Sequence, residues 1–188
     1  MGWRMDPFDL LAQVYDRFRR VPAPDPYLDL LGGNARLLDL GGGTGQVASA
    51  LVPFGVRAVV LDRSRGMLSA AQKKRGLLLV RGSAESLPFP DESFDLVVVV
   101  DALHHFKDQE RALREAARTV RRGGAVLIEE PDIRHLLVRW VWLVERLFGM
   151  RSRFLTPSQI LDRLESCGLR GQVSCDAFRA RIVARKGR

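Results

Sequence analysis

The segment FDLVVVVD at residues 94–101 contains four consecutive valines, and no polar residue alternates with them. An unbroken apolar run of strand length indicates a strand that is buried on both faces, as in a parallel sheet covered by helices. This one segment therefore favours a layered α/β fold. Comparable apolar runs occupy residues 35–40, 56–62, 77–82 and 125–130.

Segments with helical signals alternate with these runs. Helices are predicted at 45–52 and 64–74, and the amphipathic segment at 109–122 predicts a third. A capped helix begins at Thr156 and ends before Gly168, and residues 171–186 then predict a closing antiparallel pair of strands. This alternation is typical of a doubly wound α/β sheet.

Composition agrees with one globular domain over residues 1–188, with 46% hydrophobic and 28% charged residues. Cys167 and Cys175 match no metal spacing. No secretion signal is evident, so we expect both thiols to be reduced and the protein to be cytoplasmic. The longest nearly apolar stretch, at 136–144, is shorter than a membrane span. The net charge of +8 leaves nucleic-acid binding as an alternative, although the basic residues are spread along the chain.

A glycine-rich loop lies in LLDLGGGTGQVA at residues 37–48, where a predicted strand ends and a helix begins. Glycines at 41, 43 and 45 would let a ligand lie against the backbone, with the free amides of the helix start pointing at it. The next predicted strand ends in Asp62, and a carboxylate there can accept both hydroxyls of a ribose. These features predict a cofactor that contains adenosine.

The spacing of the loop distinguishes between adenosine cofactors. A dinucleotide fingerprint would place Gly or Ala at position 46, where this chain has Gln46. Asp39, two residues before the first glycine, is a poor neighbour for a pyrophosphate but can balance an ammonium or a sulfonium charge. The loop therefore favours a positively charged nucleoside and disfavours a dehydrogenase.

Four blocks of the sequence resemble, in order and spacing, the class I S-adenosylmethionine-dependent methyltransferases. The similarity is to the small-molecule branch that includes the ubiquinone/menaquinone-biosynthesis enzymes, and it covers residues 36–130. It implies a Rossmann-like, seven-stranded, mostly parallel sheet with an antiparallel terminal hairpin, helices on both faces, and S-adenosyl-L-methionine as the cofactor. The blocks are LLDLGGGTGQVASAL, VVLDRSRGMLSAAQKK, GSAESLPFPDESFDLVVVVDALHHF and ALREAARTVRRGGAVLIEE.

The resemblance also implies a distribution of the cofactor over the site. The glycine loop with Asp39 holds the methionine part, Asp62 holds the ribose, and Asp101 lies beside the reactive methyl group and the amine. Ser83 stands where the family commonly has Asp, which predicts weaker binding of the adenine because charge assistance is lost. The cofactor-binding residues implied in this way are Tyr15, Asp39, Gly41, Gly42, Gly43, Thr44, Gly45, Asp62, Arg63, Met67, Ser83, Ala84, Glu85 and Asp101.

The expected chemistry demands little from the protein. A sulfonium makes its methyl group electrophilic, so the site has to align the acceptor and exclude water, and a base is needed only for an acceptor that arrives protonated. The catalytic candidates are His105, His104 and Asp101 at the end of the fourth predicted strand, in a segment that the resemblance implies faces the acceptor. Of the two histidines, His105 is preferred. No metal site is predicted.

The acceptor is predicted to be a small apolar or aromatic molecule. The resemblance implies a lid over it at residues 132–155 and an N-terminal helix at about 7–20. Apolar residues at helical spacing in the lid fit either a helix packed on the core or an apolar wall, with peripheral membrane contact as an alternative. Two other functions stay open, an RNA-modifying methyltransferase and a non-catalytic S-adenosylmethionine-binding subunit. The base-methylating motif N/D-P-P-Y/F and a catalytic Cys are both missing from the segment DALHHF at 101–106.

Overall fold

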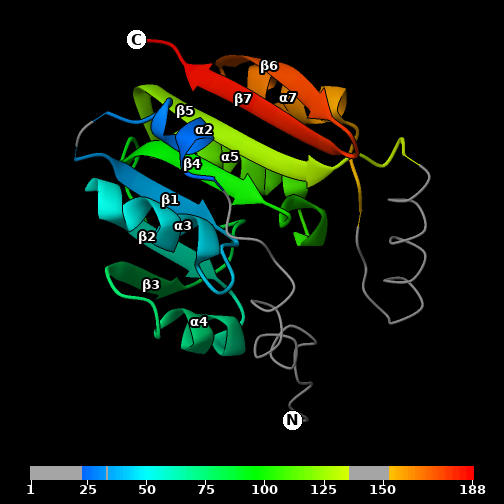
Figure 1. Ribbon diagram of the computed structural model, residues 1–188. Coiled ribbons are helices and arrows are strands. Elements are labelled where there is room, and N and C mark those ends of the chain that lie inside the picture. Colours follow the sequence, from blue (N-terminus) through cyan, green and yellow to red (C-terminus); the bar gives the residue numbers. More distant parts are fainter. Residues whose placement is uncertain (1–22, 33, 136–152) are drawn as a thin grey trace, which may run out of the picture.

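The computed structural model describes residues 23–32, 34–135 and 153–188 (Figure 1). Within these ranges, seven strands form one sheet in the order β3-β2-β1-β4-β5-β7-β6. This confirms the predicted seven-stranded α/β fold. The strands are β1 (Arg36–Leu40), β2 (Arg57–Asp62), β3 (Leu77–Arg81), β4 (Phe94–Val100), β5 (Val120–Pro131), β6 (Leu169–Asp176) and β7 (Arg179–Lys186).

The sheet is parallel from β3 to β5, and β7 runs antiparallel to both of its neighbours, β5 and β6. The chain builds outward from β1 to β3 and then crosses back to β4 on the other side of β1. The carboxyl ends of β1 and β4 therefore meet at the point where the strand order reverses, which is where ligands bind in open α/β sheets.

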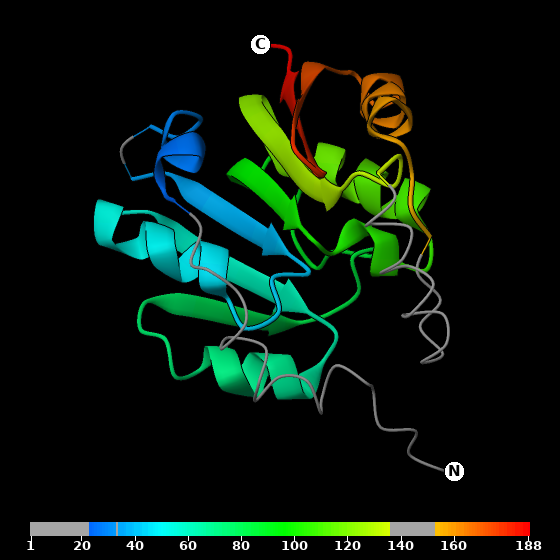
Figure 2. The same cartoon turned by 45° about the vertical axis from the view of Figure 1, so that its right-hand side comes forward.

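Helices cover both faces of this sheet. Figures 1 and 2 show α2 and α3 on one face and α5 and α7 on the other, while α4 follows β2 at the β3 edge. The helices are α2 (Asp25–Leu28), α3 (Gln46–Leu51), α4 (Arg65–Ala71), α5 (Gln109–Thr119) and α7 (Pro157–Ser166), with short 3-10 turns η1 (Val52–Phe54) and η2 (Leu103–His105).

The valine run of β4 is buried as the sequence predicted. Val97 and Val99 pack into the cluster beneath α5 and α7, whereas Leu96 and Val98 pack into the opposite cluster with α3 and Tyr27. Each of these four β4 side chains is fully buried. Successive residues of a strand point to opposite faces, so an all-apolar strand is what a sheet covered on both sides requires.

Two predicted boundaries differ from the structure. The helix expected at 109–122 ends at Thr119, because Val120 pairs with Phe94 and begins a strand that extends to Pro131. The closing antiparallel pair begins at Leu169, two residues earlier than expected. The predicted N-terminal helix and most of the predicted lid lie outside the described residues. In the described ranges, no helix is long and apolar enough to cross a membrane.

Candidate cofactor and active site

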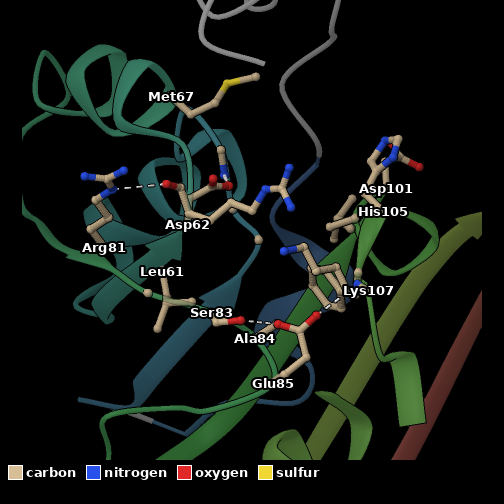
Figure 3. A pocket seen from close by; sticks show the side chains of 18 residues that line it. Leu61, Asp62, Met67, Arg81, Ser83, Ala84, Glu85, Asp101, His105 and Lys107 are labelled. Carbon is tan, nitrogen blue, oxygen red and sulfur yellow. Dashed lines mark hydrogen bonds between the residues drawn. The ribbon is translucent and has the colours of Figure 1, made fainter. Parts of the chain in front are cut away.

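A cavity of about 520 Å³ opens at the carboxyl ends of β1, β2, β3 and β4. Asp62 and Met67 lie on one side of it and Asp101 and His105 on the other, with Ser83 and Glu85 along the edge that joins them (Figure 3). The lining residues are Gly41, Gly42, Gly43, Leu61, Asp62, Arg63, Met67, Arg81, Gly82, Ser83, Ala84, Glu85, Val100, Asp101, Ala102, His105, Phe106 and Lys107.

The glycine loop forms one wall of the cavity, but different neighbours exclude a side chain at its different glycines. Gly41 has a φ of +72°, and a Cβ there would lie 2.8 Å from the Cβ of Ala102. Gly45 has a φ of +73°, and its Cβ would lie 2.8 Å from Cδ1 of Leu77. Gly45 does not line the cavity. The protein's own packing therefore accounts for a glycine at this position, where the sequence suggested room for a ligand.

Asp39 lies beneath the loop. The residue is 1% exposed, and its Oδ2 accepts a hydrogen bond from the N–H of Ala48 at 3.2 Å. A Cβ on Gly42 would lie 2.5 Å from the Asp39 carboxyl carbon, so this glycine lets the loop close over the carboxylate. Asp39 is not among the lining residues. Its charge therefore acts from below the loop, whereas the sequence suggested a direct hold on the ligand.

Asp62 is oriented by backbone donors on both of its oxygens. Gly43 donates its N–H to Oδ2 at 2.9 Å, and Ser64 donates its N–H to Oδ1 at 2.8 Å. The Ser64 hydroxyl in turn accepts the N–H of Met67 and so caps α4. The sequence D-x-S-x-x-M therefore fixes the carboxylate and the methionine on the same wall. Carboxylate oxygens have room for further donors, such as ribose hydroxyls.

Ser83 and Glu85 form a second polar edge. The Ser83 hydroxyl donates to Oε2 of Glu85, and the N–H of Lys107 donates to Oε1 at 2.9 Å. Burial alone would raise the pKa of Glu85, but hydrogen bonds from Ser83 and from backbone N–H groups hold it below its ordinary value. The negative charge of Glu85 therefore lies next to Ser83, the position at which the family more often has an Asp.

Asp101 lies directly after β4 in a left-handed conformation, with a φ of +50°. Its N–H donates to the carbonyl of Glu129 at 2.9 Å. Its carboxylate makes an ion pair with Arg179 of β7, with 3.0 Å between Nη2 and Oδ1. A non-glycine residue with positive φ is uncommon and needs support from its surroundings.

The two neighbouring histidines have different environments. His104 is 5% exposed, its Nδ1 contacts Glu130, and its ring stacks on Phe154 with 4.4 Å between centroids. It does not line the cavity, whereas His105 does. Burial, with the charges of His104 and Arg63, lowers the pKa of His105 to about 3. Of the two candidate bases, the structure therefore brings only His105 to the cavity, and its imidazole is neutral at physiological pH.

Most of the predicted cofactor residues meet in this cavity. Asp39, Thr44 and Gly45 are described but do not line it, and Tyr15 lies outside the described residues. The lining residues that the sequence reasoning missed share one signal, since they adjoin strand ends or loop residues that it had already identified. They are Leu61, Arg81, Gly82, Val100, Ala102, Phe106 and Lys107.

Comparison with known proteins agrees with this geometry. The profile of a family described as "Methyltransferase domain" matches residues 38–128. A demethylmenaquinone methyltransferase of Thermotoga maritima is 34% identical over 196 residues, which cover 86% of this chain and 85% of the relative. The ubiquinone/menaquinone biosynthesis C-methyltransferase UbiE of Stenotrophomonas maltophilia is 42% identical over 105 residues, which cover 50% of this chain and 42% of that protein. The crystal structure of YcgJ from Bacillus subtilis gives a TM-score of 0.69 at 28% identity and covers 79% of this chain and 68% of that one.

The fold and the cavity define a doubly wound α/β protein with a nucleoside site at the switch point of its sheet. The chain belongs to the class I S-adenosylmethionine-dependent methyltransferases, as the resemblance implied. The cofactor of this family is S-adenosyl-L-methionine. The chain spans about half the length of the first curated relatives that it matches.

The lining residues fit this cofactor. The carboxylates of Asp62, Glu85 and Asp101 surround the cavity and suit a ligand that carries an ammonium, a sulfonium and ribose hydroxyls. Leu61 and Met67 supply apolar surface for an adenine ring.

Proposed function

We propose that the protein transfers a methyl group from S-adenosyl-L-methionine to a small apolar or aromatic acceptor. One observation carries this proposal: the carboxylates of Asp62 and Asp101 lie on two opposite sides of one cavity (Figure 3), whose lining also includes apolar side chains such as Leu61, Met67 and Phe106. Such a cavity can bind a cationic nucleoside at both of its ends and still offer an apolar opening to a second molecule.

The roles of the residues follow from their positions. Asp62 accepts from the ribose, the N–H groups of the glycine loop face the methionine part, and Asp101 balances the positive charge. The bound cofactor supplies an electrophilic methyl group. Ala102, His105 and Phe106 form the wall beside Asp101 and would orient the acceptor toward that methyl group while limiting the access of water.

His105 is suited to hold the acceptor and poorly suited to deprotonate it. A side chain with a pKa of about 3 is a weak proton acceptor at neutral pH. Its neutral imidazole still offers one donor and one acceptor. The proposal therefore favours acceptors whose reacting atom is nucleophilic without prior deprotonation, such as an electron-rich ring carbon, which loses its ring proton to solvent after the new carbon–carbon bond has formed. The names of the two curated relatives, a ubiquinone/menaquinone biosynthesis C-methyltransferase and a demethylmenaquinone methyltransferase, point to a ring of the quinone type.

Calorimetric titration with S-adenosylmethionine, followed by transfer of a labelled methyl group, tests this function. We expect binding at a single site and labelling of a reduced naphthoquinone, with a simple aliphatic amine and a bulk RNA as matched alternative acceptors. Labelling of RNA instead would identify an RNA-modifying enzyme, and binding with no transfer to any acceptor would favour a non-catalytic subunit. Failure to bind the cofactor would refute the proposal itself.

A further inference from the structure

We propose that Arg179 is a positioning residue that holds Asp101 at the cavity wall and offsets its negative charge, so that the cavity discriminates less strongly between S-adenosylmethionine and its uncharged-sulfur product. This inference rests on the proposed function, since it concerns the same cofactor.

The contact between the two side chains has a two-point geometry. Nη1 of Arg179 donates to Oδ2 of Asp101 at 3.2 Å, and Nη2 lies 3.0 Å from Oδ1. The hydrogen bond to Oδ2 orients the carboxylate, and the close approach of Nη2 to Oδ1 adds an ion-pair contact. Arg179 itself is not among the lining residues. Any effect on a bound ligand must therefore pass through Asp101 or through the electrostatic field.

The surroundings of Arg179 keep it charged and in place. Burial lowers the pKa of its guanidinium, but the carboxylates of Asp101 and Glu129 more than compensate and raise it above its ordinary value. Nη2 of Arg179 lies 3.7 Å from Oε2 of Glu129, which also accepts the Tyr27 hydroxyl at 3.2 Å. The guanidinium thus lies between the carboxylate of Asp101, which lines the cavity, and that of the buried Glu129. The Arg179 side chain reaches from β7 past β5 to the residue that follows β4.

The contact has a consequence for the ligand because the two forms of the cofactor differ in charge. The methyl donor carries a sulfonium, whereas the demethylated product has a neutral sulfur and shares every other charged group. A positive charge on Arg179 opposes the sulfonium and has little effect on the neutral sulfur. Arg179 therefore lowers the preference for the donor over the product, and it makes the enzyme more sensitive to inhibition by its product.

The neighbouring Arg181 provides a matched control on the same face of β7. Its guanidinium contacts Glu129 with 2.6 Å between Nη2 and Oε1, and its Nε donates to the same oxygen at 2.7 Å. Both of these contacts are made with Glu129 of β5. Arg179→Gln and Arg181→Gln thus remove the same charge from two positions that differ in their contact with the cavity carboxylate.

The test measures the dissociation constants of S-adenosylmethionine and S-adenosylhomocysteine by calorimetry on the whole protein at low salt. In Arg179→Gln, we expect the preference for the sulfonium form to rise by about three- to tenfold, the range typical of one neighbouring charge in a partly hydrated site. Arg179→Lys keeps the charge and loses the two-point contact, so both affinities should fall while their ratio stays near that of the wild type. If Arg179 only supported the structure, Arg179→Gln would instead weaken the binding of both ligands by the same factor and leave their ratio unchanged.

A double-mutant cycle that combines Asp101→Asn with Arg179→Gln tests the same inference without relying on a single variant. Asp101→Asn leaves the guanidinium uncompensated, so the preference for the sulfonium form should fall, and the double variant Asp101→Asn with Arg179→Gln should restore it. An unchanged ratio in Arg179→Gln, or an equal change in Arg181→Gln, would overturn the inference while leaving the proposed function intact. If the wild-type protein bound neither S-adenosylmethionine nor S-adenosylhomocysteine, the proposed function would be overturned, and this inference with it.

Discussion

His105 should make the folded protein sensitive to acid. Its pKa is lowered to about 3, first by burial and then by the charges of His104 and Arg63. A histidine in the unfolded chain has a pKa near 6.5. Below that pH the unfolded state therefore binds a proton at this position that the folded state rejects, and stability falls as the pH drops from about 6.5 toward 3.

The size of this effect follows from the two pKa values. Between pH 8 and pH 5, a group with pKa values of about 6.5 unfolded and about 3 folded costs about 2 kcal/mol of unfolding free energy. That is a large part of the total stability of a small domain, about 5–15 kcal/mol. The contribution of His105 should therefore be visible above the other titrations of the protein.

The contribution of His105 is measured by urea unfolding of the wild type and of His105→Asn at pH 8 and at pH 5. Asn keeps a polar side chain but does not titrate. On acidification from pH 8 to pH 5, the unfolding free energy of the variant should therefore fall by about 2 kcal/mol less than that of the wild type. His135→Asn is the control, because His135 is an exposed histidine on a surface turn. Equal pH dependence in the wild type and His105→Asn would show that the imidazole is not desolvated, and our view of His105 as a neutral group would then be wrong.

Three further substitutions test other parts of the site. Asp62→Ala should weaken S-adenosylmethionine binding about tenfold or more in calorimetry, because a lost charged hydrogen bond costs about 1.5–3 kcal/mol; unchanged affinity would mean that the ribose lies elsewhere. Gly45→Ala should lower the unfolding free energy by more than Gly55→Ala, since both glycines have positive φ but only Gly45 faces a close neighbour, Leu77; equal losses in urea unfolding would refute the packing argument. Glu130→Gln should reduce the methyl-transfer rate more than it reduces cofactor affinity, and a parallel loss of both would show that Glu130 supports the whole cavity.

The layered fold and the place of the site could be predicted because their signals are local. The valine run of β4 is apolar on both faces, and that pattern alone indicates a sheet covered by helices. Asp62 could be identified for the same reason, since it ends an apolar run and precedes a helix cap. The end of the helix at Thr119 could not, because it depends on the pairing of Val120 with Phe94 across the sheet.

The features of the site that sequence reasoning missed depend on contacts between distant segments. Arg179 and Asp101 are 78 positions apart, and their contact requires the antiparallel register of β7 on β5. The sequence named both His104 and His105 as candidates, with His105 preferred, but their different environments depend on the contact of His104 with Glu130 and on the position of His105 in the cavity wall. The packing of Gly45 against Leu77 is likewise set by where β3 lies.

Two adjacent glutamates near the end of β5 support the segment after β4, in which Asp101 has a positive φ. Successive residues of a strand point to opposite faces. Glu129 therefore reaches Arg179 on one face, while Glu130 on the other accepts the backbone N–H groups of Ala102 and Leu103 at 2.9 and 2.8 Å. The segment after β4 is thus fixed from both faces of the sheet by β5, whereas the wall that carries Asp62 is fixed by the glycine loop and the cap of α4. Because the two walls depend on different strands, substitutions at the end of β5 should change how the acceptor is held while leaving the ribose side of the cavity in place.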